Sequence, residues 1–327
     1  MTAVVLGKLV GDGLLACLGV AGNAFILSSN AWHFWSGARE KPGPFLAGEM
    51  TVSCVAVANL LMDLTGFLWF VIKVFHLECL IGNAANMCVN YTLIVTAACS
   101  FWFTNCLCVF YMVNIISVPN AFFIRVKRNI SVLTYTLLVI TFTFNCVLTI
   151  PLIWPFQLHQ TNISEANGNL SVSACNVYVT NDIPVGVQIL NGFLLLYLPA
   201  GTMVYACVRI VVYLRHHIEK MERSSSSEKT LSSCSSSPAL QAQIRISRMI
   251  TCLVIVYMLC DTVLFLVILN RLFHENTDLI QTFAAFAIST FTGGIAPILI
   301  FGNSNLRKNL MSVCCPASEP THVDNKQ

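Results

Sequence analysis

Seven long apolar runs divide this chain, and each is long enough to cross a lipid bilayer as a helix. The runs lie near residues 9–32, 46–72, 86–114, 132–154, 184–214, 244–269 and 279–302. A hydrocarbon core about 30 Å thick requires roughly 20 apolar residues in a helix, which satisfies its backbone hydrogen bonds internally. The pattern predicts an all-α membrane protein, with a seven-transmembrane helix bundle over 1–302 and a short amphipathic helix and cytoplasmic tail over 303–327.

The composition excludes a water-soluble protein of this size. Of the 327 residues, 56% are hydrophobic and only 10% are charged, and the mean hydropathy is +0.73. A soluble globule needs more charge, spread through the chain, to cover its surface. The first run ends in the bulky Trp32 and Trp35 instead of a small-residue cleavage site, so we expect a retained span and not a signal peptide.

The basic residues predict the orientation in the membrane. If the N-terminus is extracellular, fifteen of the 18 Lys and Arg residues fall on the cytoplasmic side, and only Lys8, Lys73 and Arg271 fall outside. Because cytoplasmic loops are enriched in Lys and Arg, we expect a multi-pass plasma-membrane protein, surrounded by lipid, with a cytoplasmic C-terminus. The net charge of +3 reflects this topology and indicates no nucleic-acid partner.

The loop over 155–183 agrees with this orientation. It contains the sequons Asn162-Ile-Ser164 and Asn169-Leu-Ser171, and it has no Lys or Arg. Sequons are glycosylated only where the chain is outside the cytoplasm. We therefore predict an extracellular loop with N-glycans at Asn162 and Asn169.

Two cytoplasmic segments carry candidate modification sites. The loop 215–243 holds serines at 224–227, 232, 233 and 235–237, a polar stretch that is either a solvated linker or a phosphorylation cluster. Cys314 and Cys315 follow the amphipathic stretch. They are either palmitoylated, which would anchor the helix to the inner leaflet, or unmodified thiols.

The sequence contains no signature of an enzyme, and we expect no cofactor and no metal. His216 and His217 are adjacent, so their side chains point in different directions on a helix, which favours a basic pair over a metal site. A seven-span transporter would be expected to show paired halves with broken helices. No internal repeat is evident, although a transporter or a non-signalling scaffold stays open as an alternative.

Polar residues within the spans are costly in lipid and are therefore candidates for function. Asn23 and Asn59 lie at similar depths in adjacent helices, which favours a structural hydrogen bond between them, directly or through water. Asp63 lies one turn outward from Asn59 on nearly the same face, because four residues advance a helix by about 400°. We expect it to join this network or to sense an ion.

A second polar set lies in the outer halves of the later spans. Asp261 is in the sixth run with Phe265 one turn further out, and Thr96, Gln188, Asn191 and Ser289 are at comparable depth in the third, fifth and seventh runs. Apolar walls with a few polar groups suit small amphipathic molecules. Each side chain has the alternative of a hydrogen bond between helices.

Four segments resemble one receptor family, the type 2 taste receptors or bitter receptors. They are Gly22-Asn23-x-Phe25-Ile26, Leu107-x-x-Phe110-Tyr111 with Phe122-Phe123-x-x-x-Lys127-x-x-Ile130, Leu214-x-x-His217-x-x-x-Met221, and Ile298-Leu299-Ile300-Phe301-Gly302-Asn303-Ser304-x-Leu306. With seven spans and a minimal N-terminus, the resemblance extends over the whole membrane portion.

The resemblance implies a G-protein-coupled receptor for small bitter compounds that activates a gustducin-type G protein. The implied ligand-binding residues are Leu93, Thr96, Ala97, Gln188, Asn191, Asp261, Phe265, Ala285 and Ser289. The implied G-protein contacts are Arg125, Lys127, Arg128, His217, Arg245 and Arg248. Agonist binding is expected to part the inner ends of the fifth and sixth helices. In many seven-helix receptors a disulfide ties the third helix to the second outer loop, which implies Cys88 with Cys175, although spacing does not decide which of Cys79, Cys88 and Cys175 is left unpaired.

The chain departs from the family pattern at several positions. Asn59 and Asn114 stand where Arg and Lys are usual, and Leu93 and Ala97 stand at agonist-contacting positions often occupied by Trp and Asn. These differences are typical of a divergent member. A vomeronasal type 1-like pheromone receptor, which shares the short N-terminus and glycosylated loop, is the alternative within the receptor class.

Overall fold

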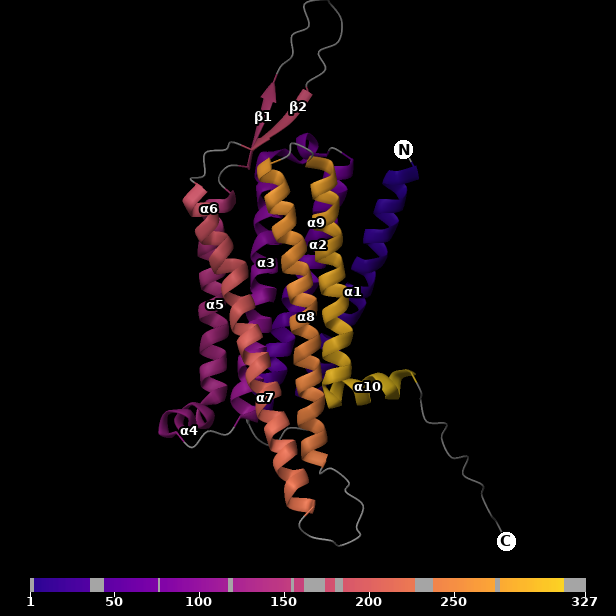
Figure 1. Cartoon of the computed structure of the whole chain (residues 1–327). Helices are drawn as coiled ribbons and strands as arrows, with labels where there is room; N and C mark the ends of the chain where they lie inside the picture. Colours follow the sequence, from indigo (N-terminus) through magenta and orange to yellow (C-terminus); the bar gives the residue numbers. More distant parts are fainter. Residues whose placement is uncertain are drawn as a thin grey trace, which may run out of the picture.

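The structure is a computed structural model that describes residues 3–35, 44–75, 77–116, 120–153, 156–161, 174–179, 185–226, 238–273 and 277–314. Long helices run side by side as a bundle, and a short hairpin stands at one end of it (Figure 1). The helices are α1 (Ala3–Trp35), α2 (Pro44–Val74), α3 (Glu78–Ile115), α4 (Ala121–Arg128), α5 (Ile130–Ile153), α6 (Val185–Gly192), the π-helical turn η1 (Phe193–Tyr197), α7 (Leu198–Ser226), α8 (Pro238–Phe273), α9 (Thr277–Gly302) and α10 (Ser304–Cys314).

Six segments of the described helices are long and apolar enough to cross a membrane. They are Val10–Trp32, Leu46–Val74, Leu80–Ile115, Ile130–Ile153, Ile189–Lys220 and Leu240–Leu266. A seventh, Phe286–Gly302 of α9, qualifies together with α10, from which it is bent by 95°. The predicted fold class, an all-α bundle of seven membrane helices followed by a short helix, is confirmed.

The two ends of the bundle are easily told apart. The strands β1 (Phe156–Thr161) and β2 (Ala174–Val179) pair antiparallel at one end, which we call the hairpin end. The short helices α4 and α10 lie at the opposite end, which we call the α10 end (Figure 1). The sequons at Asn162 and Asn169 and the tail from 315 lie outside the described residues.

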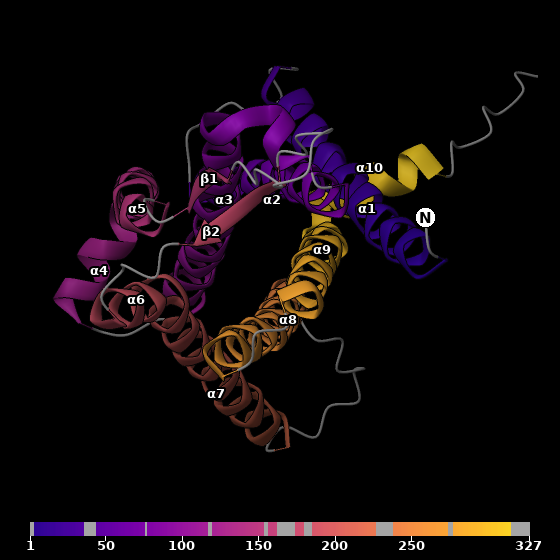
Figure 2. The same cartoon turned by 90° about the horizontal axis from the view of Figure 1, so that it is seen from above.

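Helix α3 is the centre of the bundle and the most buried of the six spans. It packs against α2, α5, α7 and α8, and Figure 2 shows α1, α2 and α9 gathered on one side of it. Near the hairpin end, Gly82 has φ of 80°, which a residue without a Cβ adopts at little cost. The backbone therefore bends there, before the main part of α3 enters the bundle.

Three aromatic rings join α3, α8 and α9 in the core. The ring centroid of Phe101 lies 4.9 Å from that of Tyr257 and 4.9 Å from that of Phe291, both edge to face. Tyr257 and Phe291 are 6.2 Å apart. Each ring is at most 3% exposed. Because such pairs add about 0.5–1.5 kcal/mol beyond burial, this aromatic trio fixes the relative positions of the three helices.

The fifth span changes its helical geometry where proline enters it. In η1 the N–H of Leu198 donates to the carbonyl of Phe193, five residues earlier. Pro199 follows directly. Proline has no N–H and its ring clashes with the carbonyl of the preceding turn, and one π-helical turn accommodates that conflict. The turn leaves backbone carbonyls open to other donors.

Candidate functional site

Among the predicted ligand contacts that the structure describes, two buried polar side chains near the hairpin end carry an atom that the fold does not satisfy. Asn191, in α6, is 3% exposed, and Asp261, in α8, is 6% exposed. Among the described residues, no group bonds to Nδ2 of Asn191 or to Oδ1 of Asp261. Most buried polar atoms in folded proteins have a partner. This pair is therefore the strongest candidate for contact with a bound molecule.

Helix α8 and the π-helical turn face each other at this level. The hydroxyl of Tyr257 donates to the carbonyl oxygen of Leu196 at 3.0 Å, and the rings of Tyr197 and Phe265 meet edge to face at 6.1 Å. On α8, Asp261 lies one helical turn from Tyr257 and one turn from Phe265. Aromatic residues thus flank Asp261 on its own helix.

The other predicted ligand contacts are distributed differently. Leu93 and Thr96 are buried, but the Thr96 hydroxyl donates to the carbonyls of its own helix at Thr92 and Leu93, at 2.7 and 3.1 Å. Ala97 is half-buried against the core. The side chains of Gln188 and Ala285 lie outside the part of the structure that is described.

Ser289 belongs to a different cluster from the one expected. Its hydroxyl donates to Oδ1 of Asp12 in α1 at 2.7 Å, and both side chains are buried. One turn further along α9, Thr292 donates to Oδ1 of Asp63 in α2. Asp12 was not among the predicted residues, although a carboxyl within an apolar run is the signal that would have identified it.

The predicted bond between Asn23 and Asn59 is not direct. Asn23 Nδ2 donates to the carbonyl of Gly19 at 2.9 Å, and Oδ1 of Asn59 accepts from the hydroxyl of Ser100. Within the described ranges, Oδ1 of Asn23 and Nδ2 of Asn59 have no partner. Asp63 bonds to Thr292 and not to either amide. Each residue is nonetheless buried, as expected of structural polar groups.

The third helix is not tied to the hairpin as expected from other receptors. Cys88 is an exposed free thiol in this structure, whereas we predicted a bond to Cys175. Cys175 lies in β2, where its backbone is in register with Gln160 of β1.

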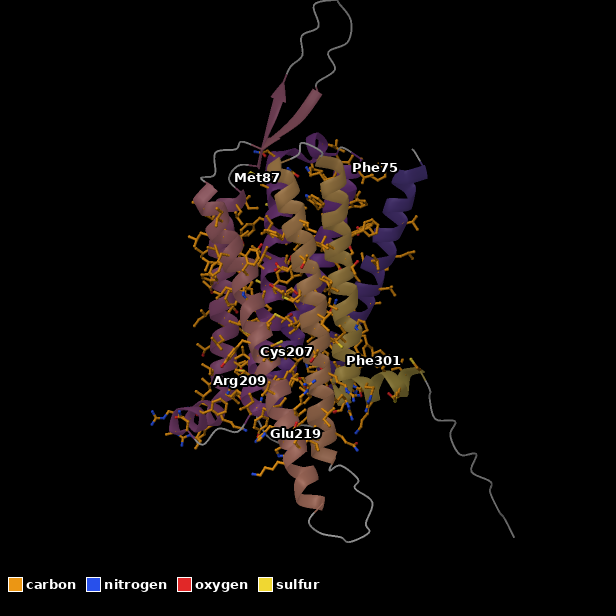
Figure 3. The ribbon with its side chains drawn as sticks, viewed as in Figure 1. Phe75, Met87, Cys207, Arg209, Glu219 and Phe301 are labelled. Atoms are coloured by element: carbon orange, nitrogen blue, oxygen red, sulfur yellow. The ribbon has the colours of Figure 1, made fainter. Side chains whose placement is uncertain are left out.

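A basic cavity opens at the α10 end. Its volume is about 390 Å³, and it is lined by Gln241, Ile244, Arg245, Arg248, Phe301 and Arg307. Figure 3 shows Phe301 near the junction of α9 and α10. Helix α8 contributes Arg245 and Arg248 to this cavity and α10 contributes Arg307, while α9 adds the ring of Phe301. Two of the three guanidinium groups belong to the predicted G-protein contacts.

The remaining predicted contacts lie at the same end of the bundle. Arg125, Lys127 and Arg128 are exposed on α4, and Lys127 Nζ donates to the carbonyl of Asn114 at the end of α3, at 3.1 Å. His217 is exposed on α7, with its ring 6.2 Å from that of Tyr213. Basic groups from α4, α7 and α8 thus share one end of the molecule, opposite Asn191 and Asp261.

Comparison with known proteins identifies the family. The family model described as taste receptor protein (TAS2R) matches residues 10–317, which extend from α1 through α10. No curated protein sequence matches the chain. The matched family is one of receptors, with small-molecule ligands and G-protein coupling, and not one of enzymes. The chain belongs to the taste receptor family, and it is a multi-pass, G-protein-coupled chemosensory receptor.

Proposed function

We propose that this receptor binds small bitter organic compounds at the hairpin end and activates a gustducin-type G protein at the α10 end. The hairpin end and the N-terminus would then be extracellular, and the α10 end cytoplasmic. The observation that carries the proposal is the pair of buried, unsatisfied atoms, Asn191 Nδ2 and Asp261 Oδ1.

The cost of leaving these two atoms unsatisfied supports a ligand site. A buried polar group without a partner costs about 1–3 kcal/mol. Buried hydroxyls elsewhere in the bundle avoid this cost by bonding to their own helix, as Thr141 and Thr149 do at 2.8 and 2.7 Å. An agonist that offers an acceptor to Asn191 and a donor to Asp261, on an apolar body, would satisfy both atoms. Many small amphipathic molecules have this chemistry.

Helix α8 connects the candidate ligand site with the basic cavity. Asp261 lies one helical turn from Tyr257 of the aromatic trio, and Arg245 lies sixteen residues before Asp261 in the same helix. At 1.5 Å per residue this separation is about 24 Å. A ligand that favours one position of α8 therefore also biases the position of Arg245 and Arg248, in proportion to its differential affinity for the two arrangements.

The charge at the α10 end suits a protein partner that binds through acidic groups. Arg245, Arg248 and Arg307 line one cavity, and guanidinium groups pair with carboxylates in a bidentate geometry. Complementary charge increases the association rate and sets the orientation of a complex. We assign this surface, with α4 and His217, to the G protein.

A calcium assay tests the proposal. Cells that express the receptor with a chimeric G protein carrying a gustducin tail are challenged with a panel of bitter compounds, and we expect a concentration-dependent response. Asp261→Asn should weaken the response about tenfold or more, since a charge-assisted hydrogen bond contributes roughly 1.5–3 kcal/mol. Thr262→Val is the matched control, because Thr262 is exposed and bonds to its own helix at Met258.

Three results would contradict the proposal. Responses limited to volatile or steroid compounds would favour a pheromone receptor of the vomeronasal type. Substrate uptake that does not depend on a G protein would favour a transporter. An N-terminal tag that antibodies reach only after permeabilisation would reverse the orientation.

A further inference from the structure

One residue without a side chain allows α8 and α9 to approach each other closely near the α10 end. A Cβ at Gly302, the last residue of α9, would collide with Sδ and Cγ of Met249 in α8 and would lie only 2.7 Å from its Cβ. Nonbonded carbon atoms prefer a separation of about 3.5–4.0 Å. Met249 is 4% exposed, so its side chain is buried against the bare backbone of Gly302.

The collision would include an atom of Met249 that cannot turn away. Rotation of the side chain moves Sδ and Cγ, but Cβ is fixed to the backbone of α8. Added bulk in a well-packed contact forces the backbones to shift, so a methyl group at position 302 would push the two helices apart at this level. Glycine at this position therefore sets how closely α8 approaches α9.

The contact lies beside the basic cavity. Arg248 and Phe301 line that cavity, and they directly precede Met249 and Gly302 in the chain. Arg245 lies one helical turn before Met249, and Phe301 is seen at the junction of α9 and α10 in Figure 3. Separation of α8 from α9 at this contact therefore widens the cavity.

Helix α9 is held in place on its side of the contact, whereas α8 is held weakly. The helix that follows α9, α10, buries Leu306, and Asn309 of α10 donates to Oγ of Ser29 in α1 at 2.6 Å. Between α8 and α7, the thiol of Cys207 and the hydroxyl of Thr251 form a weak contact at 3.6 Å. When the two helices separate, α8 is therefore the one that moves.

We propose that the contact between Gly302 and Met249 is a latch that keeps the basic cavity narrow, and that its release admits the G protein. This inference rests on the proposed coupling at the α10 end. Glycine at position 302 holds basal signalling low, because any other residue has a Cβ that would destabilise the closed arrangement. The separated arrangement has room for that Cβ, so a side chain at position 302 shifts the equilibrium toward it.

The basal signalling of Gly302→Ala tests the latch. Membranes that contain the receptor and the G protein with a gustducin tail are assayed for GTPγS binding without agonist, at equal surface expression. Overpacking by one methyl group is costly enough to shift an equilibrium about fivefold or more. We therefore expect a basal rate at least about fivefold higher than that of the unmodified receptor, whereas a mere loss of stability would not increase it. Met249→Phe adds bulk from the side of α8 and should act in the same direction, which keeps the test available if Gly302→Ala does not reach the surface.

Two further variants make the result specific. Gly294→Ala is the matched control in α9, because a Cβ there would lie 3.5 Å from Cγ1 of Val256 in α8, an ordinary contact, and it should keep the basal rate. Met249→Gly removes all three atoms that the new Cβ would meet. Adding Gly302→Ala to Met249→Gly should therefore change the basal rate by less than about twofold, as expected for two residues that act through one contact.

Fluorine NMR of the purified receptor measures the separation without a G protein. A trifluoromethyl-substituted phenylalanine in place of Phe301 puts the probe on the wall of the cavity, next to the contact. Gly302→Ala should populate a second resonance more strongly than the unmodified receptor or Gly294→Ala does.

The possible failures are distinguishable. An unchanged basal rate in Gly302→Ala and Met249→Phe, in receptors that still respond to agonist, would refute the latch and leave the coupling intact. The same fluorine spectrum in Gly302→Ala and Gly294→Ala would also refute it. An equal increase of the basal rate in the Met249→Gly background would mean that Met249 is not the opposing side chain. A second resonance in a receptor that activates no G protein, with or without agonist, would instead uphold the contact and refute the proposed function.

Discussion

Replacing Tyr257 with Phe isolates one hydrogen bond between the fifth and sixth spans. The hydroxyl of Tyr257 donates to the carbonyl of Leu196 at 3.0 Å, and the side chain is only 1% exposed. Phenylalanine keeps the ring and its edge-to-face contacts with Phe101 and Phe291. The substitution therefore removes one buried bond and leaves one carbonyl without this donor, at a position that water does not easily reach.

We expect this substitution to reduce the free energy of unfolding by about 1–2 kcal/mol, since a buried hydrogen bond contributes about 1 kcal/mol and an orphaned acceptor adds to the loss. At roughly 2–4 °C per kcal/mol the melting temperature falls by about 2–8 °C. A thiol-reactive dye measures it, because buried cysteines such as Cys106 and Cys108 become reactive on unfolding. Tyr205→Phe is the control, because Tyr205 is 59% exposed on α7 and should tolerate the change.

Equal melting temperatures for Tyr257→Phe and Tyr205→Phe would refute this reasoning. Such a result would mean that the Leu196 carbonyl finds another donor at no cost, and that the π-helical turn is not held by α8. A loss well above 3 kcal/mol would instead mean that the aromatic trio had been disturbed, since one hydrogen bond contributes less and a cavity in the core reaches that size.

Two further predictions concern helix contact and topology. Gly22→Ala should destabilise the receptor by about 1–3 kcal/mol, because its Cβ would lie 2.6 Å from that of Ala296, whereas Gly201→Ala has no atom within 4 Å and should be neutral or slightly stabilising in the unfolding assay. Asn162→Gln and Asn169→Gln should each increase the electrophoretic mobility of the receptor from mammalian cells by one glycan, and an unchanged pattern after glycosidase treatment would contradict an extracellular loop.

The membrane helices could be predicted because hydropathy is a property of one segment at a time. A run of about 20 apolar residues has few alternatives to a spanning helix, and α10 was predicted from a local amphipathic pattern. The family resemblance was carried by short motifs near the helix ends, and it is confirmed by a match over residues 10–317.

The rotation of each helix could not be predicted in the same way. In a bilayer the lipid-facing side is as apolar as the core, so the period of 3.6 residues that marks a buried face in water is lost. In α1, Leu18 is 65% exposed while Ile26 is fully buried, although both are aliphatic. For this reason the sequence did not indicate that Ser289 of α9 faces Asp12 of α1.

Contacts between residues that are far apart in the chain could not be predicted from the sequence either. Asp12 and Ser289 are 277 residues apart and meet at 2.7 Å, and no local pattern connects them. Cys88 is a second example: its bond to Cys175 was expected from other receptors and not from this chain, and the structure has a free thiol there.

The kinds of contact between helices indicate which part of the bundle can move. Helices α1, α2 and α9 are joined through buried carboxyls and hydroxyls, as at Asp63 with Thr292, and hydrogen bonds to charged groups are the stronger kind. Towards the α10 end, α7 and α8 meet through the thiol of Cys207 and the hydroxyl of Thr251 at 3.6 Å, a weak contact because sulfur is a weak donor and a weak acceptor. Less energy is therefore needed to part α7 from α8 there than to part α9 from α1 and α2. Because that end carries the basic cavity, we expect agonist binding to widen it by moving the inner half of α8 while the hydrogen-bonded group of α1, α2 and α9 stays in place.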